Sequence, residues 1–144
     1  MIDQLNFLIF GMILLLVFAV FNIVSHLILK NKVKDPKIKY FLQMNFFWNI
    51  INLIISFFAI YQNLATQKQS ELKIAEYLRG AGDILFINTF LDVGYMLIAL
   101  GLLIFGLKKL SSRFLGYSFS IFLQGLFLFF LDLILFIQIR SWGY

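Results

Sequence analysis

The chain has 144 residues, of which 62% are hydrophobic and only 13% are charged. A soluble domain of this length is about half apolar and about a quarter charged, so the composition excludes that class and predicts one integral membrane unit. The net charge of +5 does not indicate nucleic acid as a partner, because Lys and Arg lie in short loops between apolar runs. Since there is no cysteine, disulfides, thiolate metal sites and cysteine catalysis are excluded.

Four apolar runs, taken in chain order, are long enough to cross a bilayer, which requires about 20 residues. They lie at about 5–29, 40–61, 82–107 and 114–139. Lipid offers no partner for an unpaired backbone group, so each run is predicted to be a helix. The predicted fold class is an all-α membrane protein, an antiparallel bundle of four transmembrane helices in a single domain. No basic stretch precedes the first run, so we expect it to remain in the mature protein rather than act as a signal peptide.

Two short loops carry most of the positive charge. Residues 30–39 contain five lysines and Pro36, the only proline, and residues 108–113 form a second basic turn. Together these loops hold eight of the twelve Lys and Arg residues. The positive-inside rule therefore predicts a multi-pass membrane protein with both basic loops in the cytoplasm and both termini outside.

The longest connection, residues 62–81, contains the segment "SELKIAEYLR". Ser70 is a suitable N-cap and Glu71 lies in the first turn, which predicts a short helix over 70–79. Its apolar residues share one side at helical spacing. Two interpretations remain open: a helix lying on the outer membrane surface, or an ordinary connecting helix.

Polar residues recur inside the apolar runs at helical spacing. Those at 45, 49, 52 and 56 fall within about 60° of one another on a helix, and similar stripes occur in the third and fourth runs. Counting depth from the helix ends places most of them in the outer half of the bundle. The predicted cluster is built from Asn52, Ser56, Asn88, Asp92 and Asp132, and extends inward through Asn45, Asn49, Tyr95 and Gln124.

Small residues mark a further face of the third run. Gly94 and Gly101 lie seven residues apart, and such residues favour a close approach of two helices. They allow such an approach, although the four-residue spacing of the usual helix-contact motif is missing.

Asp92 and Asp132 lie well inside the runs, whereas Lys and Arg do not. A charged Asp at the bilayer centre costs at least ~2.5–3.5 kcal/mol on insertion scales. Three solutions remain: a protonated Asp, a bound cation that Asn and Gln carbonyls help to hold, or a basic residue on a partner chain. The amides have a structural interpretation as well, because interhelical amide bonds stabilise ordinary bundles by about 0.6 kcal/mol each.

Other chemistries are excluded by residue types. The chain has one histidine, so a bis-His haem site and a helical His–carboxylate di-metal cluster both lack ligands. The segment "RGAGD" at 79–83 follows no strand and has no Lys, so it does not resemble a phosphate-binding loop. We expect no catalytic residues, no metal and no cofactor, and hence no enzyme.

The segments "INTFLDVGYMLIALGLLIFG" at 87–106 and "NFFWNIIN" at 45–52 resemble those of small four-helix bacterial integral membrane proteins of unknown function. The resemblance covers mainly the second and third runs. It implies a bacterial inner-membrane protein, and it assigns no functional residue.

Two functions agree with these observations. The first is a non-catalytic subunit or assembly partner of a larger membrane complex, in which the intramembrane acids meet a basic partner. The second is a transporter or channel for protons, cations or small polar solutes, acting as an oligomer. The expected partners are the lipid bilayer and either another membrane protein or further copies of the chain.

Overall fold

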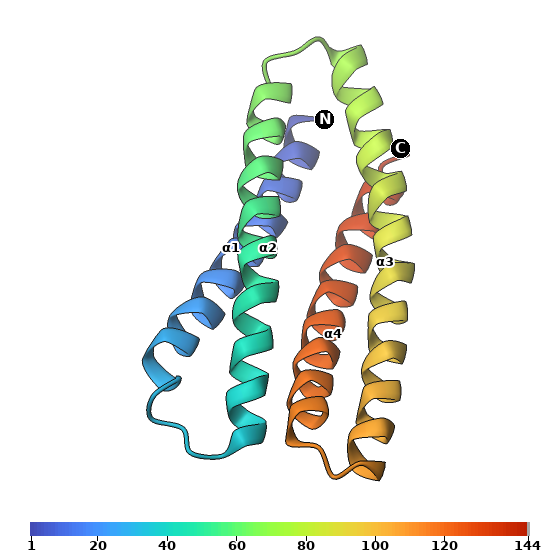
Figure 1. Cartoon of the computed structure of the whole chain (residues 1–144). Helices are drawn as coiled ribbons and strands as arrows, with labels where there is room; N and C mark the ends of the chain where they lie inside the picture. The colour runs from blue at the N-terminus through green and yellow to red at the C-terminus, as the bar shows by residue number, and fades with distance from the viewer. Residues whose placement is uncertain (144) are drawn as a thin grey trace.

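The computed structural model describes residues 1–143, which form four α-helices and no strand. The helices are α1 (Ile2–Leu29), α2 (Pro36–Thr66), α3 (Glu71–Lys108) and α4 (Ser112–Ser141) (Figure 1). The all-α class predicted from the sequence is therefore confirmed. By length and composition, each of these helices is long and apolar enough to cross a membrane.

The helices run antiparallel as two hairpins, α1–α2 and α3–α4. Figure 1 shows both termini and the α2–α3 connection at one end, which we call the terminal end. The α1–α2 and α3–α4 loops lie at the opposite, basic end. The helices of each hairpin pack along each other, and α2 also packs on α4, whereas α2 and α3 touch only sparsely. The two hairpins are thus held together mainly through α2 and α4.

A local signal explains where α2 begins. Asp35 has extended backbone angles, and its Oδ1 accepts a hydrogen bond of 2.8 Å from the backbone N–H of Lys37. Pro36 occupies the first turn, where a missing N–H does no harm and the fixed φ favours the helix. The α1–α2 loop therefore ends in a side-chain cap.

The separate helix expected over 70–79 does not exist, because α3 runs without interruption from Glu71 to Lys108. Ser70 is its N-cap residue, although the side chain makes no capping hydrogen bond. The reason is tertiary packing: Ile74 and Leu78 are buried against Leu5 rather than lying on a surface. The 38 residues of α3 are about 57 Å long at a rise of about 1.5 Å per residue.

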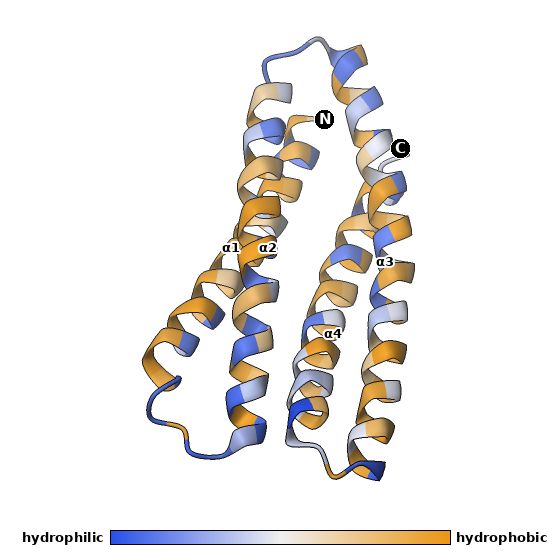
Figure 2. Cartoon of the chain, viewed as in Figure 1, coloured by the Kyte–Doolittle hydropathy of each residue, from blue (hydrophilic) through white to orange (hydrophobic). Residues whose placement is uncertain are grey.

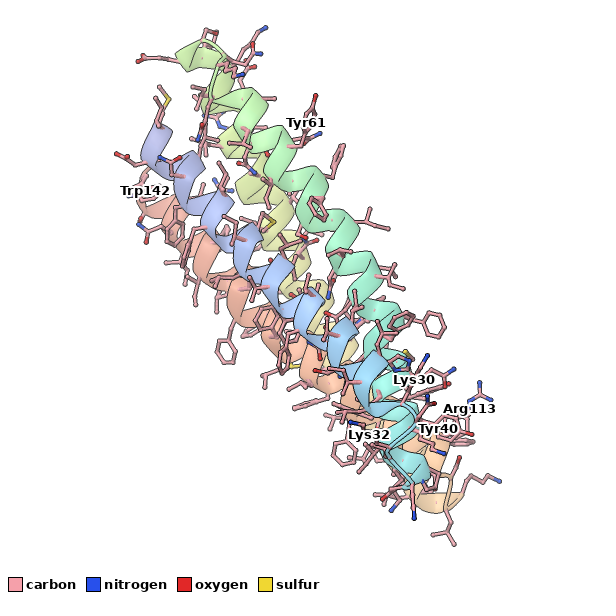
Figure 3. All side chains as sticks on the ribbon, turned by 90° about the vertical axis from the view of Figure 1, so that its left-hand side faces the viewer. Lys30, Lys32, Tyr40, Tyr61, Arg113 and Trp142 are labelled. Atoms are coloured by element: carbon pink, nitrogen blue, oxygen red, sulfur yellow. The ribbon has the colours of Figure 1, made fainter. Side chains whose placement is uncertain are left out.

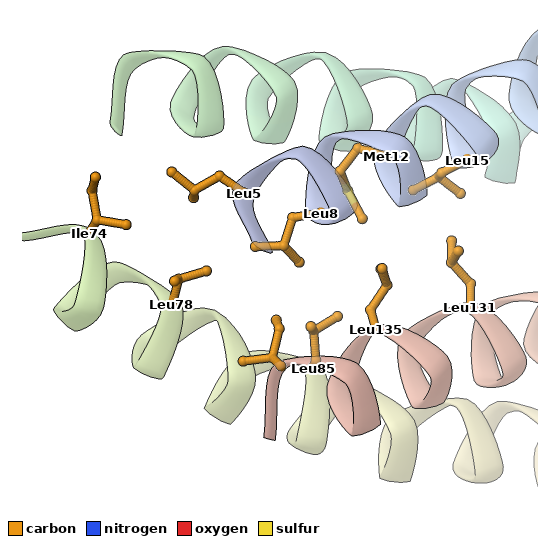
Figure 4. Close-up of a cluster of buried hydrophobic side chains, with 10 residues drawn as sticks. Leu5, Leu8, Met12, Leu15, Ile74, Leu78, Leu85, Leu131 and Leu135 are labelled. Carbon is orange, nitrogen blue, oxygen red and sulfur yellow. The ribbon is translucent and has the colours of Figure 1, made fainter. Parts of the chain in front are cut away.

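The apolar core lies near the terminal end, where the helices converge. Figure 4 shows Leu5, Leu8, Met12 and Leu15 of α1 pointing toward residues of α3 and α4. The outer faces are also apolar, with large exposed side chains on every helix, and Figure 3 shows them around the bundle. A water-soluble bundle buries such side chains, so these faces suit an apolar surrounding.

Glycines set the distance between α2 and α4. A Cβ on Gly116 would collide with the carbonyl oxygen of Lys37 and lie 2.7 Å from Cβ of Tyr40, so the two helices approach closely here. At Gly94 and Gly101 no helix of the chain makes such an approach, since a Cβ on either would have nothing within 4 Å among the described residues. Both lie on a face of α3 that no other helix of the chain covers.

Candidate functional site

A cavity of about 550 Å³ lies between the two hairpins. All four helices contribute to its wall, and the α2 residues that line it run from Trp48 to Asn63. This stretch of helix rises about 22 Å, so the cavity is long and narrow. Its rim includes the exposed side chains of Ile55 on α2 and Ile84 on α3. Because these two helices touch only sparsely, the cavity opens sideways between them.

The part of the cavity nearer the basic end, which we call its deep end, is polar. Five of the residues predicted for the polar cluster line it: Asn52, Asn88, Asp92, Tyr95 and Asp132. They come from α2, α3 and α4, and the structure therefore brings these five together. The wall between the deep end and the terminal end is mainly apolar, with Leu, Ile, Met and Phe side chains.

Asp92 is the least compensated group of the deep end. Its side chain is 97% buried, with 3% exposed, and its Oδ2 atom has no hydrogen-bond partner among residues 1–143. Asp132 lines the same deep end and is 7% exposed. Of the described residues that line the cavity, none is Lys, Arg or His. A buried carboxylate without a cation or donor is costly, so Asp92 offers a strong acceptor to whatever enters.

Two further polar atoms lack partners in the same wall. Within the described chain, Trp48 Nε1 and Asn63 Oδ1 are buried and make no hydrogen bond. The Trp48 ring meets the Tyr95 ring edge-to-face, with 5.4 Å between centroids. Three residues that line the cavity therefore each hold one buried polar atom, one donor and two acceptors, without a hydrogen bond among the described residues.

Next to the deep end, toward the basic end, an amide network joins three helices around Asn45. Asn45 Oδ1 accepts hydrogen bonds from Ser120 Oγ at 2.6 Å and from Gln124 Nε2 at 3.0 Å. Asn45 Nδ2 donates to Asn22 Oδ1 at 3.3 Å, and Asn52 Nδ2 donates to Gln124 Oε1 at 3.3 Å. Figure 2 shows the corresponding polar bands in the part of α2 nearer the basic end. The network closes the space between α2 and α4 below the cavity.

The remaining predicted residues use their polar groups within their own helix. Asn49 Nδ2 donates to Asn45 O at 2.7 Å, and Ser56 Oγ donates to Leu53 O at 2.9 Å. Both side chains are fully buried, yet neither is among the residues that line the cavity. Of the nine predicted residues, five line the cavity, Asn45 and Gln124 belong to the amide network together with Asn52 of the cavity, and Asn49 and Ser56 bond to the backbone of their own helix.

Sequence reasoning left four contributing residues out of the cluster. Ser120 and Asn22 complete the amide network, and Trp48 and Asn63 supply unpaired groups to the cavity. Helical spacing could have indicated two of them. Ser120 precedes Gln124 by one turn, and Asn63 continues the stripe of α2 seven residues after Ser56.

The arrangement is suited to noncovalent binding. Among residues 1–143, no group of three or more His, Cys, Asp or Glu side chains could hold a metal ion. Another acid of α3, Asp83, lies outside the cavity and pairs with Arg140 at 2.6 Å, with both side chains exposed. Asp92 and Asp132 therefore supply the carboxyl groups of the cavity.

Comparison with known proteins gives one match and two negative results. The chain matches no curated protein and no solved structure. A protein-family model matches residues 14–133, which include all nine predicted polar residues. The chain therefore belongs to the Family of unknown function (DUF6992).

Proposed function

We propose that the chain spans the inner (cytoplasmic) membrane of a bacterium four times, with the basic end in the cytoplasm. Tyr40 lies near Lys30, Lys32 and Arg113 at one end, whereas Tyr61 and Trp142 lie toward the other (Figure 3). Aromatic residues concentrate at both membrane–water interfaces, and positive charge concentrates in cytoplasmic loops. The helix from Tyr40 to Tyr61 rises about 32 Å, which matches a hydrocarbon core about 30 Å thick.

Within this membrane, the function that the geometry favours is the binding and transport of a small solute, without catalysis. The observation that supports it is Asp92, a buried carboxylate without a partner that lines a cavity of about 550 Å³. Ligand cavities in proteins typically measure about 300–1,000 Å³ and combine apolar walls with a few polar groups. Intramembrane acids facing a cavity commonly mark ion or substrate pathways.

The amide network supplies the barrier that such a transporter needs. In this structure the cavity lies on the outer side of the Asn45–Gln124 contact, and the network separates it from the basic end. Release toward the cytoplasm would require α2 and α4 to separate here. In the proposed cycle the two hairpins are the moving parts.

The second candidate is a non-catalytic subunit of a larger membrane complex. It is favoured by the same Asp92, which an Arg or Lys from a partner helix would neutralise, and by the uncovered apolar face around Gly94 and Gly101. However, a partner helix is too wide to enter the cavity and would have to lie outside its opening between α2 and α3, reaching Asp92 with one side chain. A small molecule fits within the cavity itself.

Cysteine accessibility tests the transport proposal directly, because the chain has no native cysteine. Ala59→Cys places a thiol in the cavity wall, and Phe57→Cys places one on the exposed outer face of the same helix as a control. A membrane-impermeant maleimide is applied to vesicles of each orientation. Labelling of Ala59→Cys from both faces, with Phe57→Cys unlabelled, supports alternating access. Labelling from the outer face alone, or from neither, overturns transport.

The subunit candidate has its own test. A mild-detergent pull-down from the native host, followed by mass spectrometry of the intact assembly, shows whether a second protein is bound in stoichiometric amount. A stoichiometric protein partner supports the subunit, and a homo-oligomer or single chain excludes it.

A further inference from the structure

We infer that the ligand of the cavity is an organic cation: one ammonium or guanidinium group attached to an elongated apolar body. This inference rests on the proposed solute-binding function and specifies its substrate class. The geometry points to it through three features of the cavity, namely the charge at its deep end, the aromatic pair beside that charge and the apolar wall along its length.

The charge of the ligand follows from the two carboxylates. Asp92 and Asp132 line the same deep end, and of the described lining residues none carries a positive charge. An anionic ligand would be repelled by both carboxylates, and a neutral one would leave them without a counter-charge. A cation supplies the opposite charge and, where it carries N–H groups, also donates to a carboxylate.

The aromatic pair suits an ammonium or guanidinium head. Trp48 and Tyr95 both line the cavity, on the helices that carry Asn52 and Asp92, and their rings meet edge-to-face at 5.4 Å. The ring faces of Trp and Tyr attract organic cations, and this attraction strengthens when water is excluded. Carboxylate and indole together therefore recognise a cationic head group at this end.

The apolar wall excludes a hydrated inorganic ion as the natural occupant. Hard cations such as Mg²⁺ and Ca²⁺ take six or more oxygen ligands, and most of this wall consists of hydrocarbon side chains such as Leu8, Met12 and Leu128. A hydrocarbon body contacts these side chains favourably. The sideways opening between α2 and α3 gives such a body a route from the lipid.

The shape of the cavity limits the body of the ligand. About 550 Å³ spread along about 22 Å of helix corresponds to a narrow channel rather than a broad chamber. Gln62, Asn63 and Tyr77 line it at the terminal end, so a second polar group on the far end of the ligand would meet hydrogen-bonding partners. A single ring or a linear chain fits this space better than a fused polycyclic body.

The test uses benzylammonium as the cationic probe and benzyl alcohol, which has nearly the same size and shape, as the neutral one. The full chain, carrying Trp142→Phe so that Trp48 is the remaining tryptophan, is placed in nanodiscs of phosphatidylcholine, which attract no cation by net charge. Binding is read from Trp48 fluorescence. Three chains are compared: this background alone, with Asp92→Asn, and with Asp83→Asn, which removes the same charge from an exposed site on the same helix.

We expect the cation to bind the background chain at least about tenfold more tightly than benzyl alcohol, because a hydrogen bond or contact with a buried charge contributes a factor of about 10–100. Asp92→Asn should weaken cation binding by about the same factor, and Asp83→Asn should leave it unchanged. The comparison of the two probes uses the background chain alone. It therefore tests whether the ligand is a cation even where Asp92→Asn fails to fold.

The remaining outcomes separate the two proposals. Equal binding of both probes, or cation binding that Asp92→Asn does not weaken, overturns the substrate class while leaving a solute-binding cavity in place. Failure of both probes to bind, together with no labelling of Ala59→Cys from either face, overturns the proposed function itself.

Discussion

The side-chain amide of Gln124 in α4 donates to Oδ1 of Asn45 in α2 over 3.0 Å, and both side chains are almost fully buried. This contact joins two helices from different hairpins at the level where the cavity ends. It gives the buried asparagines of α2 a hydrogen-bond partner in α4. Because Asn45 also bonds to Ser120 and Asn22, the amide network depends on this residue.

Replacing Asn45 by Ala should lower the free energy of unfolding by roughly 1–3 kcal/mol. The change removes two bonds between α2 and α4 and leaves Ser120 and Gln124 as buried donors, and interhelical bonds in membranes contribute about 0.6 kcal/mol on average and up to about 1.7. Unfolding by SDS in mixed micelles, followed by circular dichroism, measures it. The exposed Gln43→Ala on the same helix is the control, and equal stability of the two variants would contradict the role of the network.

Gly116→Ala should destabilise the bundle by about 1–3 kcal/mol, because the new methyl group meets the backbone of α2 at Lys37 and Phe41. Gly94→Ala is the matched control: its methyl group has nothing within 4 Å, and Ala favours a helix by about 0.5–1 kcal/mol over Gly. The same SDS titration measures both. Similar losses for the two variants would show that α2 and α4 do not pack as described.

Asp92→Leu should raise the free energy of unfolding by about 1–3 kcal/mol while abolishing the binding of a cationic probe. A buried polar atom without a partner costs the fold about this much, and Leu removes it. Asp83→Leu breaks an exposed ion pair with Arg140, which contributes about 0–1 kcal/mol, so this variant should show no gain from relieved burial. Thermal unfolding in detergent, run beside the Trp48 fluorescence assay, tests both effects. A loss of stability in Asp92→Leu would mean that the carboxylate has a stabilising partner.

The orientation of the chain is tested by single cysteines in two loops. Asn31→Cys lies in the basic loop between α1 and α2, and Gln69→Cys lies in the connection between α2 and α3. With an impermeant maleimide on intact cells, we expect Gln69→Cys to react at once and Asn31→Cys only after permeabilisation. The reverse pattern would place the termini in the cytoplasm.

The helices were predictable from the sequence because hydrocarbon length constrains apolar runs strongly. The residues at which the helices begin and end were harder to predict. Residues 62–66 and 71–81 are polar enough for a loop, yet nothing in them stops a helix, and burial of Ile74 and Leu78 extends α3 through them.

The inward direction of the amide stripe was also predictable, since the helical period places Asn45, Asn49 and Asn52 on one face. The hydrogen-bond partners of these polar groups were not predictable from the sequence. Counting depth along each helix treats all polar residues at one level as neighbours, whereas here α2 packs on α4 and stands apart from α3. That difference in packing gives Asn45 hydrogen-bond partners and leaves Asp92 facing a cavity.

The network around Asn45 also imposes an order on how the chain is built. Ser120 and Gln124 come 75 and 79 residues after Asn45. At a synthesis rate of about 5–20 residues per second, Asn45 is synthesised about 4–16 s before these partners. During that interval Asn45 can already donate to Asn22 of α1, within the first hairpin. The first hairpin can therefore enter the membrane as a partly satisfied unit and acquire its remaining bonds when the second hairpin arrives.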